Sequence, residues 1–426
     1  MTRPLLLLDA TGPESTALIN AALARGHGVH AVPSSPTATG GPGKGPHARV
    51  TGWCLTDLSQ PDRAQEQITA YARRHNVGAV LTVNEYLTDL TAYICADLDL
   101  PGNVPALARA ARDKAVMADT LTAAGVRIPR TRPVRDHHQA RAALADPRIG
   151  LPCVIKPVGG SGSAGVTVAT SLAEVGGAVD TARAAVHPAA PVVLVQAYVT
   201  GTQYSVESLT RDGATTHLAI TRKTVTAGAQ RVELAHSLPA RLPPDVQAAV
   251  YQQVDTAVHA VGVRNGASHT EVIVDETGRC TVIEVAARLG AGHIAILIGH
   301  ALGIDVFTAL VDVAFGHRPN LARTVDRYAT VRFVTSPGTG RFANVEGLPE
   351  PGPDVPLVRW RVEPGSLVHE PATNAHRLGC FIVTGDRPAV VEEHADMLLR
   401  QIIVHVHPDV PPADQPSSAS TSAIAP

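Results

Sequence analysis

The segment from Cys153 to Val166 restricts the fold more than any other part of the chain. It begins CVIKP, an apolar run that predicts a buried strand, and continues GGSGSAG, in which no side chain is large enough to build a core. A glycine loop directly after a strand lets backbone N–H groups approach an anion, and Lys156, at the strand edge, adds a point charge. The same residues are also explained by a flexible hairpin loop and a lysine whose aliphatic stem lies along the strand. Other segments must therefore decide between an anion-binding loop and a plain hairpin loop.

Composition excludes several classes of protein. The 426 residues suffice for two or three domains, while a net charge of −2 and an aromatic content of 3% argue against nucleic acid or a membrane surface as partner. The 5 cysteines occur singly without a CxxC pair, which argues against a disulfide framework or a zinc site and fits a reducing cytoplasm. The apolar run Leu5 to Leu8 is too short for a signal peptide, and no segment approaches transmembrane length. We therefore expect a soluble cytoplasmic protein.

Apolar periodicity predicts a mixed fold of α/β and α+β type. RPLLLLDA, TGPESTALINAALARG and HGVHAVP predict strand, helix and strand, the pattern of a parallel sheet with ligands at its carboxyl edge. The GGPGKG segment at 40–45 lacks the GKS or GKT ending of a phosphate-binding P-loop and is interpreted as a surface loop. The Pro/Ser/Ala-rich end, 409–426, predicts a disordered tail.

Two glutamates mark a predicted hairpin. Strands at Thr270–Val274 and Thr281–Val285, joined by DETGR, each carry one, Glu271 and Glu284. Arg288 lies four residues beyond Glu284, so in an extended strand both would face the same side. Carboxylates in apolar strands are costly to bury unless paired or bound to a cation, and two that converge suit Mg²⁺. A surface hairpin facing water explains one glutamate better than two glutamates and an arginine.

The order of these motifs resembles the ATP-grasp superfamily: RDK, then IKP with GGSGSAG, then QAYVTGTQ, then HTEV and IEVAAR. AHSLP and the 269–290 segment most resemble the bacterial L-amino acid ligases. The resemblance covers roughly residues 1–405. It implies an ATP-grasp fold with a Rossmann-like pre-grasp domain, two ATP-grasp subdomains and a C-terminal mixed α/β domain before the tail, at residues 1–108, 109–190, 191–326 and 327–408.

The resemblance also implies roles for individual residues. Arg288 would steady the transferred phosphoryl group, Lys156 would contact phosphate and lie near the adenine, and His236 would lie near the acyl substrate. Glu271 and Glu284 would hold Mg²⁺. ATP binding would fall to Lys114, Lys156, Gly159, Gly160, Ser161, Gly162, Ser163, Gln196, Ala197, Tyr198, Gln203, Glu271 and Glu284.

Three positions depart from the family pattern. Gln196 and Gln203 stand where the family usually has glutamates for the adenine hinge and the ribose, so hydrogen bonding is kept without charge. Ala286 stands where an asparagine is common in the family, so one oxygen ligand is missing. Whether the site binds a second metal ion is therefore open.

Five residues are candidates to face the substrates, and four have a simpler alternative or a weak assignment. Glu85 could accept an ammonium group or cap a helix, and Lys223 could meet an anion or end an exposed strand. His236 could equally be a loop histidine, and His293 is predicted weakly to line the pocket. The full set is Glu85, Lys223, His236, Arg288 and His293.

The resemblance implies a ligase that activates a carboxylate as an acyl-phosphate and joins it to an amine, with two amino acids giving a dipeptide-like amide, ADP and phosphate. Homodimers are common among such relatives. Two alternatives stay open: formyl or carboxyl transfer of the purine-synthesis type, and a catalytically silent nucleotide-binding module. The first alternative would need a cluster of basic residues in the N-terminal domain to bind a phosphorylated substrate, and the sequence shows none there. The second does not explain why the lysines, the glutamates and the arginine occur together.

Overall fold

A four-stranded parallel sheet forms the first unit of the computed structural model, which describes residues 2–34, 49–185 and 192–408. The GGPGKG segment and the tail predicted to be disordered lie outside the described residues. The strand order is β3-β2-β1-β4. The elements are β1 (Leu5–Leu8), α1 (Gly12–Ala24), β2 (Val29–Val32), β3 (Gly52–Trp53), α2 (Pro61–Arg74), β4 (Ala79–Thr82), η2 (Glu85–Leu87), α3 (Thr88–Asp97), α4 (Pro105–Ala108) and η3 (Arg109–Ala111).

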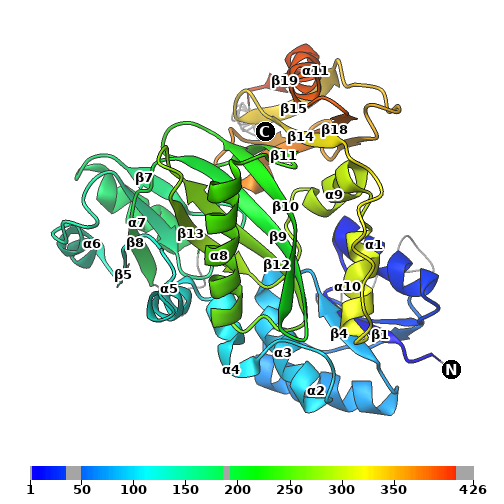
Figure 1. Ribbon diagram of the computed structural model, residues 1–426. Coiled ribbons are helices and arrows are strands. Elements are labelled where there is room, and N and C mark those ends of the chain that lie inside the picture. The colour runs from blue at the N-terminus through cyan, green and yellow to red at the C-terminus, as the bar shows by residue number, and fades with distance from the viewer. Residues whose placement is uncertain (1, 35–48, 186–191, 409–426) are drawn as a thin grey trace, which may run out of the picture.

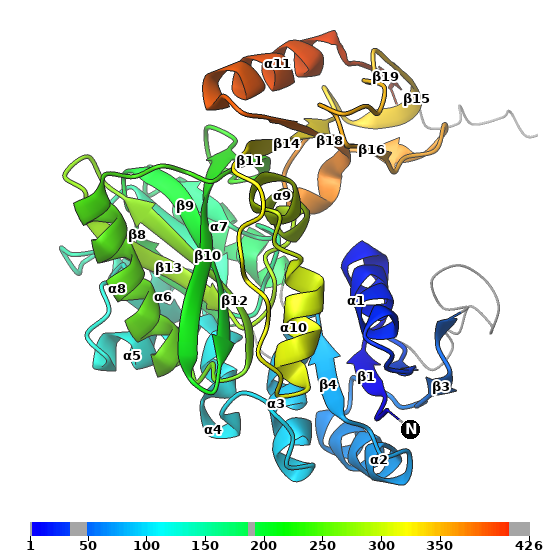
Figure 2. The same cartoon turned by 45° about the vertical axis from the view of Figure 1, so that its right-hand side comes forward.

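The run of four leucines in β1 is explained by burial on both faces of this sheet. Leu5 and Leu7 belong to a core that also contains residues of α1 and of the distant helix α10 (Val306–Ala314), whereas Leu6 and Leu8 pack with α2 and α3. A parallel sheet covered on both sides has no polar face, so its strands need no alternation. Figures 1 and 2 both place α10 beside α1. The strand–helix–strand pattern predicted for this region is confirmed.

A smaller antiparallel sheet, of order β5-β8-β6-β7, carries the glycine loop between β6 and β7, which follow each other in the chain and pair at one end of the sheet. Asp113 caps the preceding helix by accepting hydrogen bonds from the N–H groups of Ala115 and Val116, so Lys114 is its first residue. The elements of this unit are α5 (Lys114–Ala123), β5 (Thr131–Val134), α6 (His137–Ala143), β6 (Cys153–Pro157), β7 (Thr167–Ala169), α7 (Glu174–Ala184) and β8 (Val193–Ala197).

An eight-stranded sheet of order β13-β12-β9-β10-β11-β14-β18-β16 forms the centre of the molecule. The predicted hairpin is present as β12 and β13, which pair antiparallel with Glu271 opposite Glu284. Helix α8 packs on β13, and α9 packs on β11 and β14. The elements up to α9 are β9 (Thr202–Arg211), β10 (Ala214–Val225), β11 (Glu233–Leu238), α8 (Pro244–Ala260), β12 (Gly266–Val274), β13 (Cys280–Ala286) and α9 (Ile294–Leu302).

The C-terminal part of the chain extends this sheet and adds a second one, of order β17-β15-β19. Helix α11 lies over β14 and β18, where Arg332 forms ion pairs with Glu392 and Asp396. Figure 2 shows this unit at the top of the molecule. Its elements are β14 (Tyr328–Thr335), β15 (Gly340–Glu346), β16 (Leu357–Trp360), β17 (Leu367–Val368), η4 (Asn374–His376), β18 (Arg377–Gly385), α11 (Pro388–Gln401) and β19 (Ile403–His407).

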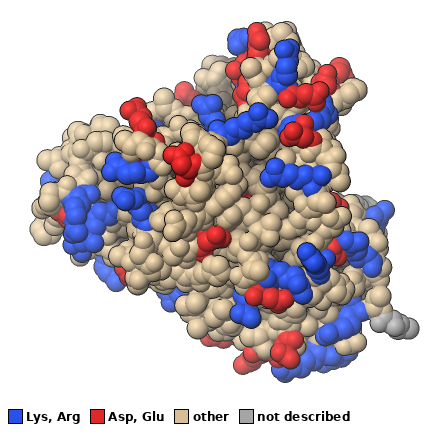
Figure 3. Space-filling model, viewed as in Figure 1, with Lys and Arg blue, Asp and Glu red and all other residues tan. Residues whose placement is uncertain are grey.

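The surface carries no dominant charge on the face drawn in Figure 3, where basic and acidic side chains are interspersed. In the part of the chain that the structure describes, no single helix has the length and apolarity needed to cross a membrane; α9 and α10 pass that test only together, bent by 110°. Most residues of both helices are buried in the core.

Candidate functional site

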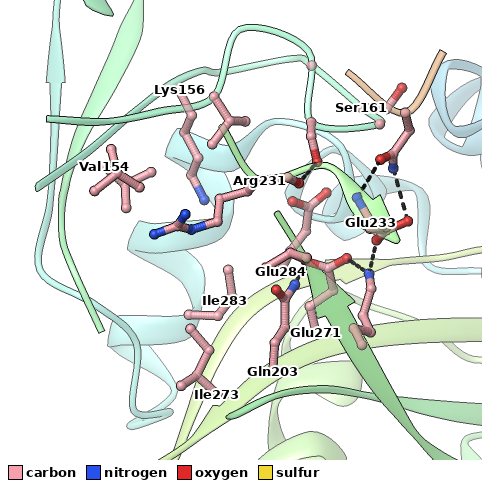
Figure 4. Close-up of a pocket in the computed structure, with 18 of the residues that line it drawn as sticks. Val154, Lys156, Ser161, Gln203, Arg231, Glu233, Glu271, Ile273, Ile283 and Glu284 are labelled. Atoms are coloured by element: carbon pink, nitrogen blue, oxygen red, sulfur yellow. Dashed lines mark hydrogen bonds and ion pairs between the residues drawn. The ribbon is translucent and has the colours of Figure 1, made fainter. Parts of the chain in front are cut away.

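A cavity of about 640 Å³ is lined mainly by residues of the four-stranded antiparallel sheet and of the eight-stranded sheet, and it unites most of the predicted site residues. Figure 4 shows side chains from both sheets converging on it. Gly159, His236 and His293 are not on its wall. The predicted residues that line it are Glu85, Lys114, Lys156, Gly160, Ser161, Gly162, Ser163, Gln196, Ala197, Tyr198, Gln203, Lys223, Glu271, Glu284 and Arg288.

The glycine loop is held over the cavity by contacts from three other parts of the chain. The Asn374 N–H donates to the carbonyl oxygen of Gly162 at 3.0 Å, and the Ser163 hydroxyl donates to the carbonyl oxygen of Arg231 at 2.7 Å. The Tyr86 hydroxyl lies 3.3 Å from that of Ser161. Gly162 has φ +61°, a conformation that glycine adopts without strain. The loop therefore depends on contacts that the local sequence does not contain.

Two of the three buried lysines on the wall are neutralised. Lys114 Nζ lies 3.0 Å from Glu284 Oε1 and donates to the carbonyl oxygen of Gly160 at 2.6 Å. Lys223 forms ion pairs with Glu233 and Glu271. Burial lowers the pKa of each lysine, but the carboxylates outweigh it, so both pKa values lie above the ordinary range. The suggestion that Lys223 ends an exposed strand is wrong, because its side chain is only 2% exposed.

Lys156 is different, because among the described residues no carboxylate lies within ion-pairing distance of it. The residue is 5% exposed and pairs with Leu194 of β8, whereas the pairing of β6 with β7 ends at Ile155. Lys156 therefore lies near the end of its strand, where the glycine loop begins. Burial lowers the pKa of Lys156 to about 8, and the charge of Lys114 adds to this while Glu284 opposes it. An uncompensated buried ammonium group is costly unless an anion joins it.

Glu271 and Glu284 point into the cavity from paired strands (Figure 4). Burial raises the pKa of Glu271, but Lys223 and His269 outweigh it and hold the pKa well below its usual range, so the carboxylate is ionised. No group of three or more His, Cys, Asp or Glu side chains in the described ranges is arranged to hold a metal ion. Two carboxylates nonetheless fit Mg²⁺, which binds few protein oxygens and takes phosphate oxygens as further ligands.

Arg288 forms an ion pair with Glu85, 203 residues away. The strand β13 ends at Ala286, so Arg288 follows the strand and does not continue it as expected. The alternative that Glu85 caps a helix is wrong, because Asn84 caps that short helix and Glu85 faces the arginine. Burial lowers the pKa of Arg288, whereas Glu85 raises it above its ordinary value. The carboxyl edge of the parallel sheet thus reaches the cavity.

The predicted adenine hinge lies at the end of β8. The Gln196 side-chain amide donates to the Thr131 hydroxyl at 2.8 Å, and the Ala197 N–H donates to the carbonyl oxygen of Arg130. The Ala197 N–H is therefore occupied, and a base would meet the remaining backbone groups of Ala197 and Tyr198. The Gln203 amide lies 3.5 Å from Glu271 Oε2, which brings the predicted ribose position close to the predicted metal position.

Neither of the two predicted histidines lines the cavity. His236 is in β11 and 1% exposed, so the loop alternative is wrong; its Nε2 lies 3.2 Å from Glu233 Oε2. His293 has φ +66° immediately before α9 and is not among the residues that line the cavity, so the prediction that it lines the pocket is wrong.

Sequence reasoning missed Glu233, which the structure places at the centre of a charge network. Its carboxylate contacts Lys223 and accepts a hydrogen bond from the Asn374 amide at 2.9 Å, and its N–H donates to Asn374 Oδ1 at 3.0 Å. An acidic residue three positions before His236 was visible in the sequence, whereas nothing local pointed to Asn374. Also missed was Glu207, which contacts His269 Nδ1 at 2.9 Å and thereby orients the side chain beside Glu271.

Three family models match separate parts of the chain: an ATP-grasp N-terminal domain at residues 19–102, an ATP-grasp domain at 149–296 and an L-amino acid ligase C-terminal domain at 332–407. The central match contains the glycine loop, Glu271, Glu284 and Arg288.

Relatives and solved structures agree with these matches. An alanine–anticapsin ligase of Bacillus subtilis is 28% identical over 291 residues, which are 63% of this chain and 61% of that protein. An uncharacterised protein of Sinorhizobium fredii is 24% identical over 84% of this chain and 73% of its own length. An L-amino acid ligase structure from Bacillus licheniformis superposes with a TM-score of 0.82 at 20% identity, covering 95% of this chain and 99% of that one.

Proposed function

The chain belongs to the ATP-grasp family of ADP-forming carboxylate–amine ligases, and on that premise we propose that it joins two amino acids into a dipeptide-like amide. The support for amino acids as substrates is the similarity to an alanine–anticapsin ligase and to the C-terminal domain of L-amino acid ligases. The chain spans 61% of the alanine–anticapsin ligase, so the substrates of that enzyme are not carried over by name.

The reaction begins with phosphoryl transfer. A carboxylate oxygen of the first substrate attacks the γ-phosphorus of ATP, the bond to ADP breaks, and an acyl-phosphate forms. The positive side chains Lys114, Lys156 and Arg288 surround the place where negative charge accumulates. Phosphoryl transfer needs little covalent help from a protein, so positioning and charge neutralisation carry the catalysis.

Glu271 and Glu284 would hold the magnesium ion that ATP-grasp enzymes typically use. Bound there, Mg²⁺ would neutralise charge on the phosphates. In the structure, Lys114 forms an ion pair with Glu284, and Lys223 forms one with Glu271. These ion pairs hold both carboxylates at the cavity. Ala286 offers no oxygen, so we propose a site that relies on two protein carboxylates.

The amine then attacks the acyl carbon, its nitrogen loses a proton and phosphate leaves. Water would hydrolyse the acyl-phosphate, so the cavity must exclude it during this step. Gly162 contacts Asn374 and Ser163 contacts Arg231, and these contacts hold the glycine loop over the cavity. In that position the loop would keep water away from the acyl-phosphate.

A single observation carries the proposal: Lys156 is buried on the cavity wall, which it shares with Glu271 and Glu284, and no carboxylate of the described residues forms an ion pair with it. The test is ADP formation with Mg²⁺ and pooled amino acids, with one amino acid omitted at a time and the products weighed by mass spectrometry. We expect ADP formation that requires two amino acids, and a product whose mass is the sum of their masses less one water. ATP binding without ADP formation in any amino acid pool would overturn the proposal and favour a catalytically silent nucleotide-binding module.

A further inference from the structure

Three arginines of the C-terminal part of the chain lie close enough to His293 for their charges to act on it. Arg359 lies in β16, Arg361 follows that strand, and Arg377 begins the neighbouring strand β18. Strand pairing fixes this grouping, because Arg359 is opposite Cys380 and the Arg361 N–H donates to the carbonyl oxygen of Leu378. We call these three residues the arginine cluster.

The arginine cluster has little negative charge to balance it. Arg377 Nη1 lies 3.6 Å from Glu233 Oε2, a carboxylate already shared with Lys223. In the described part of the chain, no carboxylate lies within 4 Å of Arg359 or Arg361. Burial and the charges of Arg359, Arg377 and Arg361, together with His236, lower the pKa of His293 to about 4. The imidazole is therefore neutral near pH 7, in a strongly positive surrounding.

Two nitrogen atoms at this place are buried without a hydrogen-bond partner. They are His293 Nδ1 and Arg377 Nη1. The rest of the Arg377 side chain is well fixed, since Nε donates to the carbonyl oxygen of Asn374 at 2.9 Å and the guanidinium lies 3.9 Å from the centre of the Phe333 ring. Among the described residues, Arg377 Nη1 has only the Glu233 carboxylate nearby, at 3.6 Å and beyond hydrogen-bond distance. Buried polar atoms are nearly always hydrogen-bonded, so this fixed guanidinium lacks a hydrogen-bond acceptor at that nitrogen.

The arginine cluster adjoins the cavity through Glu233 and Gly292. Glu233 lines the cavity and lies within 4 Å of Arg377 on its other side. Gly292 lies directly before His293, and a β-carbon there would come within 2.5 Å of His236 Cε1 and 3.2 Å of the Phe333 ring. The backbone that leaves the cavity at Ala291 thus leads to the cluster within two residues.

We propose that Arg359, Arg361, Arg377 and His293 form a second anion site, which binds a carboxylate group of a substrate that takes no part in phosphoryl transfer. The inference rests on the proposed function, since it supposes that the cavity takes amino acids. The reacting carboxylate meets Lys114, Lys156 and Arg288, so an anion at the arginine cluster is a different group. It is either the α-carboxylate of the amine substrate or the side-chain carboxylate of an acidic substrate.

The test compares ligands that differ only in this charge. Binding of L-alanine and L-alaninamide, and of L-glutamate and L-glutamine, is measured by calorimetry on the full chain with Mg²⁺ and a non-hydrolysable ATP analogue. We expect one member of one pair, the one with the additional carboxylate, to bind about tenfold or more tightly, as for a charged hydrogen bond. Because alanine also carries the reacting carboxylate, a preference within the alanine pair identifies the α-carboxylate of the amine substrate only where the arginine variants below reduce it. A preference within the glutamate pair identifies the side chain.

Variants then locate the preference. Arg359→Gln and Arg361→Gln should each reduce it several-fold, and Arg359→Lys should restore part of it. Arg400→Gln, which removes an exposed positive charge from α11, should leave it unchanged. Arg377 is kept, because its loss would also remove the packing on Phe333.

Two results would overturn the inference: no preference in either pair for the unaltered protein, or a preference that both glutamine variants retain. The proposed function fails separately, if no amide forms in any amino acid pool. An arginine-dependent carboxylate preference without amide formation would keep the anion site and reject the dipeptide product.

Discussion

Replacement of Lys156 by methionine should stabilise the free protein while it removes activity. The lysine is buried and has no carboxylate partner in the described ranges, so the folded chain bears the cost of its desolvation. A lowering of the pKa from 10.5 to about 8 corresponds to about 3 kcal/mol. Methionine has a similar length and no charge, so we expect an increase of that order in unfolding free energy at pH 7. Loss of one phosphate contact should lower kcat about 10²–10³-fold.

The pH dependence of the unfolding free energy independently checks whether Lys156→Met stabilises or destabilises the protein. Because the pKa of Lys156 lies below that of an unfolded lysine, the folded chain releases this proton near pH 8 while the unfolded chain keeps it until about pH 10.5. This group therefore contributes stability that grows as pH rises through that window. The difference in unfolding free energy between Lys156→Met and the unaltered protein should shrink over the same window, as measured by urea denaturation at a series of pH values.

Lys114→Met is the matched control, because Lys114 is buried on the same wall but paired with Glu284. Its loss leaves that carboxylate without its cation and the Gly160 carbonyl oxygen without its donor, so this variant should be destabilised. A Lys156→Met protein that unfolds as readily as Lys114→Met would refute the reasoning and point to a structural role for Lys156.

Three further predictions concern the same cavity. Lys223→Met leaves Glu233 and Glu271 without their shared cation and should lower the unfolding free energy by about 3–5 kcal/mol in urea denaturation; a loss below about 1 kcal/mol would contradict the ion-pair assignment. Glu284→Gln should raise the Mg²⁺ concentration for half-maximal ADP formation about tenfold or more, whereas Glu276→Gln, in the exposed turn of the same hairpin, should not. Asn374→Ala removes the two hydrogen bonds between its side chain and Glu233, which help to place the Asn374 N–H against Gly162, and should raise the ADP formed per amide; an unchanged ratio would show that the Asn374 side chain does not help to seal the site.

Local patterns were enough for much of this structure. The apolar run of β1, the DETGR hairpin and the glycine loop were all predicted, because strand periodicity and turn chemistry act over a few residues. The sequence placed one glutamate on each strand of the hairpin, and the structure shows that Glu271 and Glu284 are direct cross-strand partners. The placement of His236 in a strand was not predicted, since the AHSLP segment carries no clear alternation.

By itself, the sequence determined which chemical groups are present and which of them share a strand or a loop. Only the tertiary structure decided their partners. Glu85 meets Arg288 across 203 residues, and Asn374 meets Glu233 across 141. Such contacts depend on how separate sheets pack, and no short-range pattern encodes that. For the same reason three lysines that look alike in the sequence differ in the fold, where two face carboxylates and Lys156 faces none in the described residues.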